Sequence, residues 1–168
     1  MNPDTVSAAN KLLAIFDLLK DIGHEVPDEI GCSDADLSVF EEHYPVPLPQ
    51  DLRDFLTLIL PSRLLDIGVF KSLPPALLLQ EQQDAVPFEG NMKHGFFGLG
   101  WWTGDADGDG WFYDLRNGRI YAVMLYHNDE ESREAIHELA YHDFGSFGEW
   151  VDYLYGECQE RGWMPEQQ

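Results

Sequence analysis

The stretch Phe96–Tyr126, FFGLGWWTGDADGDGWFYDLRNGRIYAVMLY, decides the fold of this chain. Aromatic and β-branched residues stand on both sides of two turn-forming segments, a pattern typical of strands joined by tight connections. Asn117 and Gly118 both tolerate the positive φ that a two-residue hairpin turn requires. The sequence therefore predicts a β-hairpin between Trp111–Arg116 and Arg119–Tyr126.

The turn also predicts the register of the hairpin and the two sides of its strands. The expected opposed pairs are Arg116 with Arg119, Leu115 with Ile120, Tyr113 with Ala122, and Trp111 with Met124. One face is then apolar and able to cover a core, with Trp111, Tyr113, Leu115, Ile120, Ala122 and Met124. The other face is expected to be mixed, with Asp114 diagonal to Arg119.

Helices are predicted on both sides of this stretch. Apolar residues recur at helical spacing in three segments: from Asp4 or Ser7 to Ile22, from Gln50 to Leu60, and from Ser146 to Gly162. Ser146 and Glu149 have the spacing of a capping box at the start of the last helix.

Four other segments have weaker patterns. Ser33 is expected to cap a shorter helix that buries Leu37, Phe40 and Tyr44. Residues 74–83 are another candidate helix, because proline is tolerated in a first helical turn. Residues 63–73 could form a short strand. Residues 127–141 are expected to form a loop followed by a strand or a helical turn.

Length and composition indicate one domain. A chain of 168 residues, 44% of them hydrophobic, can bury roughly 70% of its unfolded surface around a single core. No apolar run approaches the ~20 residues of a membrane span, and the N-terminus has no signal-peptide pattern. Cys32 and Cys158 are too few for a disulfide framework. We expect a cytoplasmic protein with a single α+β domain over residues 1–168, in which helices flank a mostly antiparallel sheet.

The net charge restricts the class of partner. Thirty-one acidic residues against ten basic ones give a formal charge of −21. Nucleic acids and anionic membranes repel such a surface, so neither is expected as a partner. A basic protein partner is one interpretation of the charge, and a surface selected for solubility is the other.

The acidic turn has part of a calcium-binding motif. Asp105, Asp107 and Asp109, followed by Gly110, match the start of a calcium loop. The twelfth position, where a bidentate glutamate is required, is Arg116. We therefore interpret this segment as a solvated acidic turn and expect no metal site there.

No other set of residues has the pattern of a catalytic or cofactor site. His137 and His142 have one residue too many between them for the H-E-x-x-H zinc motif, although both could meet His127 in space. Cys158 falls on an apolar helix stripe, where a thiol is usually inert. We expect no cofactor and no enzyme activity, and a metal-dependent enzyme is the least favoured alternative.

Trp101 and Trp102 are adjacent on a predicted strand, so their side chains point to opposite faces. One of the two is expected to lie in the core. The other could be an exposed anchor for a protein partner beside the acidic turn. The alternative is that neighbouring elements bury both.

An ordered set of motifs resembles the SUKH superfamily, which contains yeast cell-wall-assembly regulators and bacterial toxin-immunity proteins. The set spans residues 34–156. It consists of LSVFEEHY at 37–44, LPQDLRDFL at 48–56, GLG at 98–100, WFYDL at 111–115, GRIY at 118–121 and SFGEWV at 146–151. Residues 1–33, the first helix and a loop, precede it.

The resemblance implies a SUKH-like fold and a non-enzymatic, protein-binding function. Together with the acidic charge, it implies an immunity protein that neutralises a cognate basic toxin domain of the nuclease type. A regulatory or scaffold module of the same superfamily is the alternative. The predicted partner-binding residues are Trp101, Trp102, Asp105, Asp107, Asp109, Asp129, Glu130 and Glu131. The sequence does not predict an oligomeric state.

Overall fold

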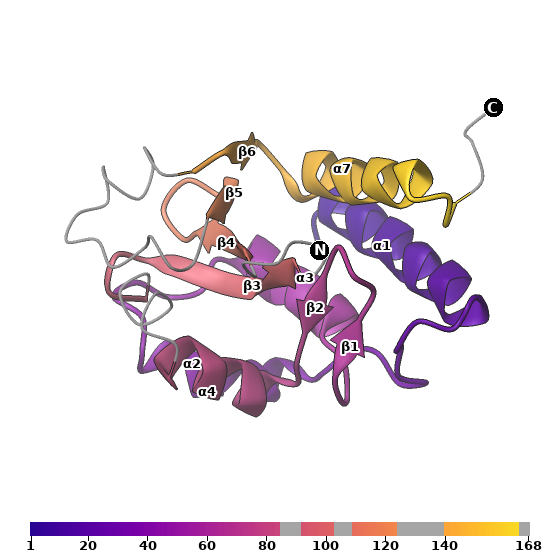
Figure 1. Cartoon of the computed structure of the whole chain (residues 1–168). Coiled ribbons are helices and arrows are strands. Elements are labelled where there is room, and N and C mark those ends of the chain that lie inside the picture. The colour runs from indigo at the N-terminus through magenta and orange to yellow at the C-terminus, as the bar shows by residue number, and fades with distance from the viewer. Residues whose placement is uncertain (85–91, 103–108, 124–139, 165–168) are drawn as a thin grey trace.

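A computed structural model of the chain describes residues 1–84, 92–102, 109–123 and 140–164. Within these residues, six antiparallel strands form one sheet in the order β1-β2-β3-β4-β5-β6, so each strand pairs with its neighbours in the sequence. The strands are β1 (Leu65–Asp66), β2 (Lys71–Ser72), β3 (Phe96–Trp102), β4 (Asp109–Asp114), β5 (Ile120–Val123) and β6 (His142–Phe144). Helices accompany this sheet, which confirms the predicted α+β class (Figure 1).

The helices lie in two groups (Figure 1). The long helices α1 (Pro3–Asp21) and α7 (Phe147–Glu160) pack side by side, and α3 (Gln50–Ile59) packs against α1. On the lower side of the molecule, α4 (Pro75–Asp84) lies beside α2 (Ser38–Glu41) and the 3-10 helix η1 (Asp34–Leu37). These positions confirm every helix predicted from periodicity.

The β4–β5 hairpin has a different register from the predicted one. Tyr113 pairs with Ile120, not with Ala122, and the amide of Asp114 donates a 2.9 Å hydrogen bond to the oxygen of Arg119. The connection therefore contains four residues, from Leu115 to Gly118. Two side chains stabilise this longer turn.

Asp114 and Asn117 stabilise the turn, because each side chain accepts a hydrogen bond from the backbone amide two residues further along the chain. Asp114 Oδ1 accepts the Arg116 amide at 2.9 Å, and Asn117 Oδ1 accepts the Arg119 amide at 2.9 Å. Gly118 has a φ of 75°, whereas no described residue other than glycine has a positive φ, so the predicted two-residue turn through Asn117 was wrong. The register shifts by two residues, and because side chains alternate with a period of two, the predicted apolar face is preserved.

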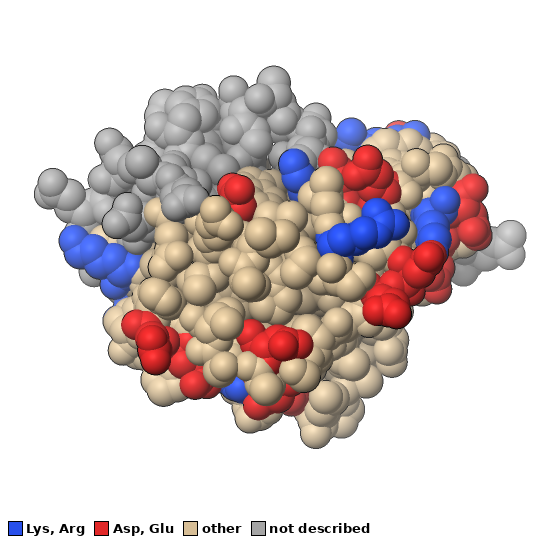
Figure 2. Space-filling model, turned by 90° about the horizontal axis from the view of Figure 1, so that it is seen from below, with Lys and Arg blue, Asp and Glu red and all other residues tan. Residues whose placement is uncertain are grey.

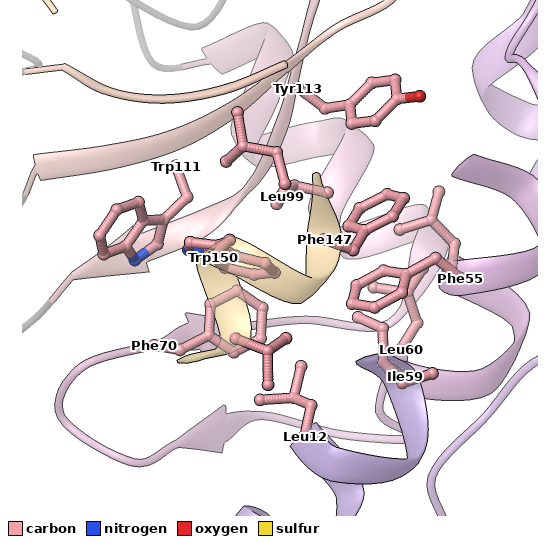
Figure 3. Packing of buried hydrophobic residues seen from close by; sticks show 14 of the residues in the cluster. Leu12, Phe55, Ile59, Leu60, Phe70, Leu99, Trp111, Tyr113, Phe147 and Trp150 are labelled. Carbon is pink, nitrogen blue, oxygen red and sulfur yellow. The ribbon is translucent and has the colours of Figure 1, made fainter. Parts of the chain in front are cut away.

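The predicted apolar face of the hairpin packs against α1, α3 and α7 and forms the main core with them. Trp111, Tyr113 and Ile120 are buried there with residues of α1, α3 and α7. Figure 3 shows the aromatic side chains that join these elements. The rings of Phe55 and Phe147 stack with centroids 3.9 Å apart, and those of Trp111 and Trp150 meet edge to face at 5.9 Å. Met124 lies outside the described residues.

The opposite face of the sheet combines apolar residues with Asp114, as predicted, but its apolar residues are buried. Phe96, Phe112, Tyr121 and Val123 are buried there as a second cluster. Asp114 is fully buried, because its carboxylate and amide both serve the hairpin turn. The sheet therefore buries apolar residues on both faces, which explains the density of aromatic residues in the quoted stretch.

Three local predictions need correction or completion. The N-cap of α1 is Asn2, whose Oδ1 accepts the Asp4 amide at 2.9 Å, because Pro3 takes the first helical position. At α7, Ser146 accepts the Glu149 amide as predicted, but the Glu149 carboxylate accepts from Gly145 instead of closing the box on Ser146. Residues 63–73 hold two short strands, β1 and β2.

Candidate protein-binding surface

Of the predicted partner-binding residues, the structure describes Trp101 with its side chain. It describes Trp102 and Asp109 by their backbone only. Trp101 lies on β3, is half-buried, and packs against both apolar clusters. Lys71 Nζ lies 6.0 Å from the centroid of its indole. The backbone of Trp102 pairs with that of Asp109, but their side chains are not described. Asp105, Asp107, Asp129, Glu130 and Glu131 lie outside the described residues.

The residues considered for metal binding have other contacts. The Nη1 of Arg116 donates a 3.0 Å hydrogen bond to the oxygen of His94. His142 Nε2 lies 3.0 Å from the Tyr153 hydroxyl, and burial lowers the pKa of this histidine. Among the described residues, no three His, Cys, Asp or Glu side chains are grouped closely enough to hold a metal ion. His127 and His137 lie outside them.

A hollow of about 440 Å³ opens on the side of α2 and α4. We call it the proline groove. Its lining includes Cys32, Ala35, Asp36, Val39, Pro61 and Pro74. These residues come from three segments that are far apart in the sequence, so the groove is a product of tertiary packing.

One wall of the proline groove contains Gly31 and Cys32, whose backbone is hydrogen-bonded to the C-terminal end of α3. The amides of Gly31 and Cys32 donate hydrogen bonds of 2.7 Å and 3.0 Å to the oxygens of Leu60 and Thr57. These bonds satisfy carbonyl groups near the end of the helix. Gly31 has a φ of 112°, and a Cβ at this position would lie 3.0 Å from the Thr57 oxygen, so glycine is required.

The other walls are formed by proline residues. Pro61 follows α3, while Pro74 and Pro75 begin α4, where the Leu78 amide donates a 2.8 Å hydrogen bond to the Pro74 oxygen. A proline ring fixes φ and removes backbone freedom. The backbone of these walls is therefore restricted at the three prolines, which reduces the conformational entropy that a partner would have to remove there.

One exposed apolar side chain lies in the lining of the groove, and another lies outside the lining on α4. Val39 in its lining is 37% exposed, and Leu77, which follows Ala76 on α4, is 48% exposed. The sequence contained a signal for Val39, because this residue falls outside the buried stripe of Leu37, Phe40 and Tyr44. No pattern in the sequence indicated that Val39 and Pro74 would line the same hollow.

One carboxylate, that of Asp36, lies in the lining of the groove, and Asp34 precedes it by two residues. Hydrogen bonds from Ser33 lower the pKa of Asp36, and the guanidinium of Arg53 lowers the pKa of Asp34. Arg53 also forms an ion pair with Glu41, so its guanidinium is paired with two carboxylates, those of Asp34 and Glu41. Seen from below, the molecule has a broad uncharged area with both acidic and basic side chains around its margin (Figure 2).

The thiol in the groove is not a nucleophile at neutral pH. Burial raises the pKa of Cys32 to about 11, and the carboxylates of Asp36 and Asp34 add to this effect. The protonated Sγ lies 3.7 Å from the Leu56 oxygen, to which it donates. The thiolate is the reactive form of cysteine, so the raised pKa disfavours reaction at this thiol.

Comparisons with protein-family models, curated proteins and solved structures found no match to this chain. The SUKH resemblance therefore stays a prediction from the sequence motifs. In the described part of the chain, none of the helices combines the length and the apolar character that crossing a bilayer would need.

Proposed function

We propose that this chain is a non-enzymatic domain that binds a basic protein, and that it acts as an immunity protein against a nuclease-type bacterial toxin. The observation that carries the proposal is the proline groove, an apolar hollow whose lining contains the Asp36 carboxylate, in a chain of net charge −21. The SUKH resemblance supplies the toxin as the class of partner.

The groove has the two components of a protein interface. Protein interfaces have a water-excluding centre of apolar anchors and a polar rim. Val39 supplies exposed apolar area, and Asp36 supplies charge in the same lining. A basic partner with an apolar side chain at the centre of its binding surface complements both.

The charge and the apolar anchors act on different steps of binding. Long-range attraction between an acidic and a basic surface speeds encounter and discriminates between partners. Desolvated apolar contacts chiefly slow dissociation. We therefore assign the association rate to the carboxylates and the lifetime of the complex to the groove.

Co-expression with the toxin encoded by the adjacent reading frame tests the proposal. We expect the wild-type chain to restore growth of the toxin-expressing cells and to copurify with the toxin. Failure of both results would contradict the immunity function. Copurification with a basic protein that is not toxic would instead support the regulatory alternative.

Two matched variants test whether the groove is the contact surface. Val39→Lys places a cation in the groove, and Leu18→Lys makes the same charge change at a residue of α1 that is 43% exposed. We expect Val39→Lys to weaken the complex and Leu18→Lys to leave it nearly unchanged. Equal affinities for the two variants would place the toxin elsewhere on the surface.

A further inference from the structure

A second hollow, of about 580 Å³, lies between the N-terminal ends of α1 and α7 and the β4–β5 turn. We call it the Tyr113 cleft. The side chains that give it its chemistry are Asp4, Thr5, Lys11, Asp51, Tyr113 and Asp152. They come from four elements, α1, α3, β4 and α7.

Two hydroxyl groups in this cleft have no protein partner. Thr5 and Tyr113 are each only 4% exposed, yet neither hydroxyl forms a hydrogen bond with any group in the described part of the chain. The ring of Tyr113 stacks on Phe147 with centroids 5.3 Å apart, and its hydroxyl points away from the core (Figure 3). Both residues belong to the lining of one hollow, so their hydroxyl oxygens face its interior and are available to a bound group.

The hydroxyl of Tyr113 is held in its neutral form. Burial raises its pKa to about 12, and the carboxylates of Asp51 and Asp114 add to the effect. A neutral phenol can accept a hydrogen bond from a cation. Gly118 keeps the space beside it open, because a Cβ there would lie 3.3 Å from the phenolic oxygen.

The charged side chains of the cleft favour a cation. Its lining has three carboxylates, those of Asp4, Asp51 and Asp152, against the single ammonium of Lys11. Lys11 forms an ion pair with Asp152. Within the described residues, the carboxylates of Asp4 and Asp51 form no ion pair, so two negative charges remain uncompensated in the lining.

The helix ends do not make the cleft an anion site. The N-terminal ends of α1 and α7 would attract an anion if their amides were available. Asn2 already accepts the Asp4 amide, Ser146 accepts the Glu149 amide at 3.2 Å, and Glu149 accepts the Gly145 amide at 2.6 Å. These caps occupy only some of the first-turn amides, but the carboxylates of Asp4, Asp51 and Asp152 in the same lining repel a phosphate or carboxylate.

We propose that the Tyr113 cleft binds a guanidinium group, supplied by an arginine side chain of the partner protein. A guanidinium offers five N–H donors in one plane, which suits a site with several separate acceptors better than a compact ammonium does. The assignment of the source rests on the proposed function, since a basic partner provides the arginine.

The site can be tested without the toxin. We would titrate the ¹⁵N-labelled full chain with N-acetylargininamide and follow the amides of Thr5, Gly118 and Gly145. We expect saturable shifts at these residues, weaker binding of N-acetyllysinamide, and no binding of N-acetylcitrullinamide, which has the shape but not the charge. Equal binding of the citrulline compound would overturn the proposal. Tighter binding of free arginine than of the capped amide would overturn the side-chain source.

Variants separate the site from the general acidity of the chain. Tyr113→Phe keeps the stacked ring and should weaken N-acetylargininamide binding about threefold to tenfold, the effect of losing one hydrogen bond to a charged group. Asp51→Asn should weaken it about twofold to fivefold, as for a partly exposed ion pair. Asp17→Asn, an exposed acid elsewhere on α1, is the control. An equal effect of Asp17→Asn would show only diffuse attraction and overturn the site.

The outcomes for the cleft and for the proposed function are distinguishable. Binding of the arginine compound without capture of the toxin would support the cleft and contradict the immunity function. Capture of the toxin by a chain that does not bind the arginine compound would contradict the cleft alone.

Discussion

The indole Nε1 of Trp111 donates a 3.0 Å hydrogen bond to the backbone oxygen of Val69. The neighbouring Trp150, whose ring centroid lies 5.9 Å away, has no hydrogen-bond partner for its own Nε1 among the described residues. Both side chains are completely buried. The two tryptophans therefore share the same core but differ in the hydrogen bonding of the indole N–H.

This difference predicts unequal effects of the same substitution. Both Trp→Phe changes remove similar volume, but Trp111→Phe also removes a buried hydrogen bond, whereas Trp150→Phe removes an unsatisfied donor. We expect Trp111→Phe to lower the free energy of unfolding by about 1 kcal/mol more than Trp150→Phe does. Urea denaturation of the two variants measures this. Equal losses would mean that the Trp111 hydrogen bond makes no net contribution.

A pair of glycines predicts opposite changes in stability. Gly118→Ala forces a side chain into the left-handed region at φ 75° and should destabilise the protein by roughly 1–2 kcal/mol. Gly156 lies inside α7, and a Cβ there would contact nothing within 4 Å. Gly156→Ala should therefore stabilise by about 0.5–1 kcal/mol through the better helix propensity of alanine. Thermal unfolding of both variants tests this, and an unchanged Gly118→Ala midpoint would contradict the described turn.

The thiol in the proline groove predicts an alkaline pH dependence. The pKa of Cys32 is raised from 9.0 to about 11 in the folded chain, because burial and two carboxylates disfavour the thiolate. Its contribution to stability is thus complete below pH 9 and is lost as the pH rises through about 11. In a Cys158→Ala background, the rate of alkylation by iodoacetamide should keep rising between pH 9 and 11. A plateau at pH 9 would contradict the raised pKa.

The acidic turn predicts a change in association kinetics. Lysine substitutions at Asp105, Asp107 and Asp109 should slow association with the toxin and flatten its dependence on salt, because they remove long-range attraction between the acidic turn and a basic partner. Stopped-flow kinetics at low and high salt measure both quantities, with circular dichroism to check the fold. If the lysine variant restores growth and associates as fast as wild type, the acidic turn is not part of the contact surface.

Local patterns in the sequence were sufficient for much of the fold. The stripes of α1, α3 and α7 repeat every three or four residues, so helical geometry alone places them on one buried side. The hairpin and its core-facing side could also be predicted, even though the register was wrong by two residues. Alternation along a strand depends only on odd and even positions, so a two-residue error leaves every side chain on its predicted face.

Other features were decided by the tertiary structure. The sequence did not indicate that the second face of β3–β5 holds a buried apolar cluster, because burial depends on what packs over that face and not on the alternation within a strand. It also did not indicate that Thr5 and Tyr113 share a cleft, or that Val39 and Pro74 share a groove. The periodicity of apolar residues predicts on which face of its own helix or strand a side chain lies. Which elements then meet depends on the packing of the whole core, and contacts between residues 108 or 35 positions apart have no local signature.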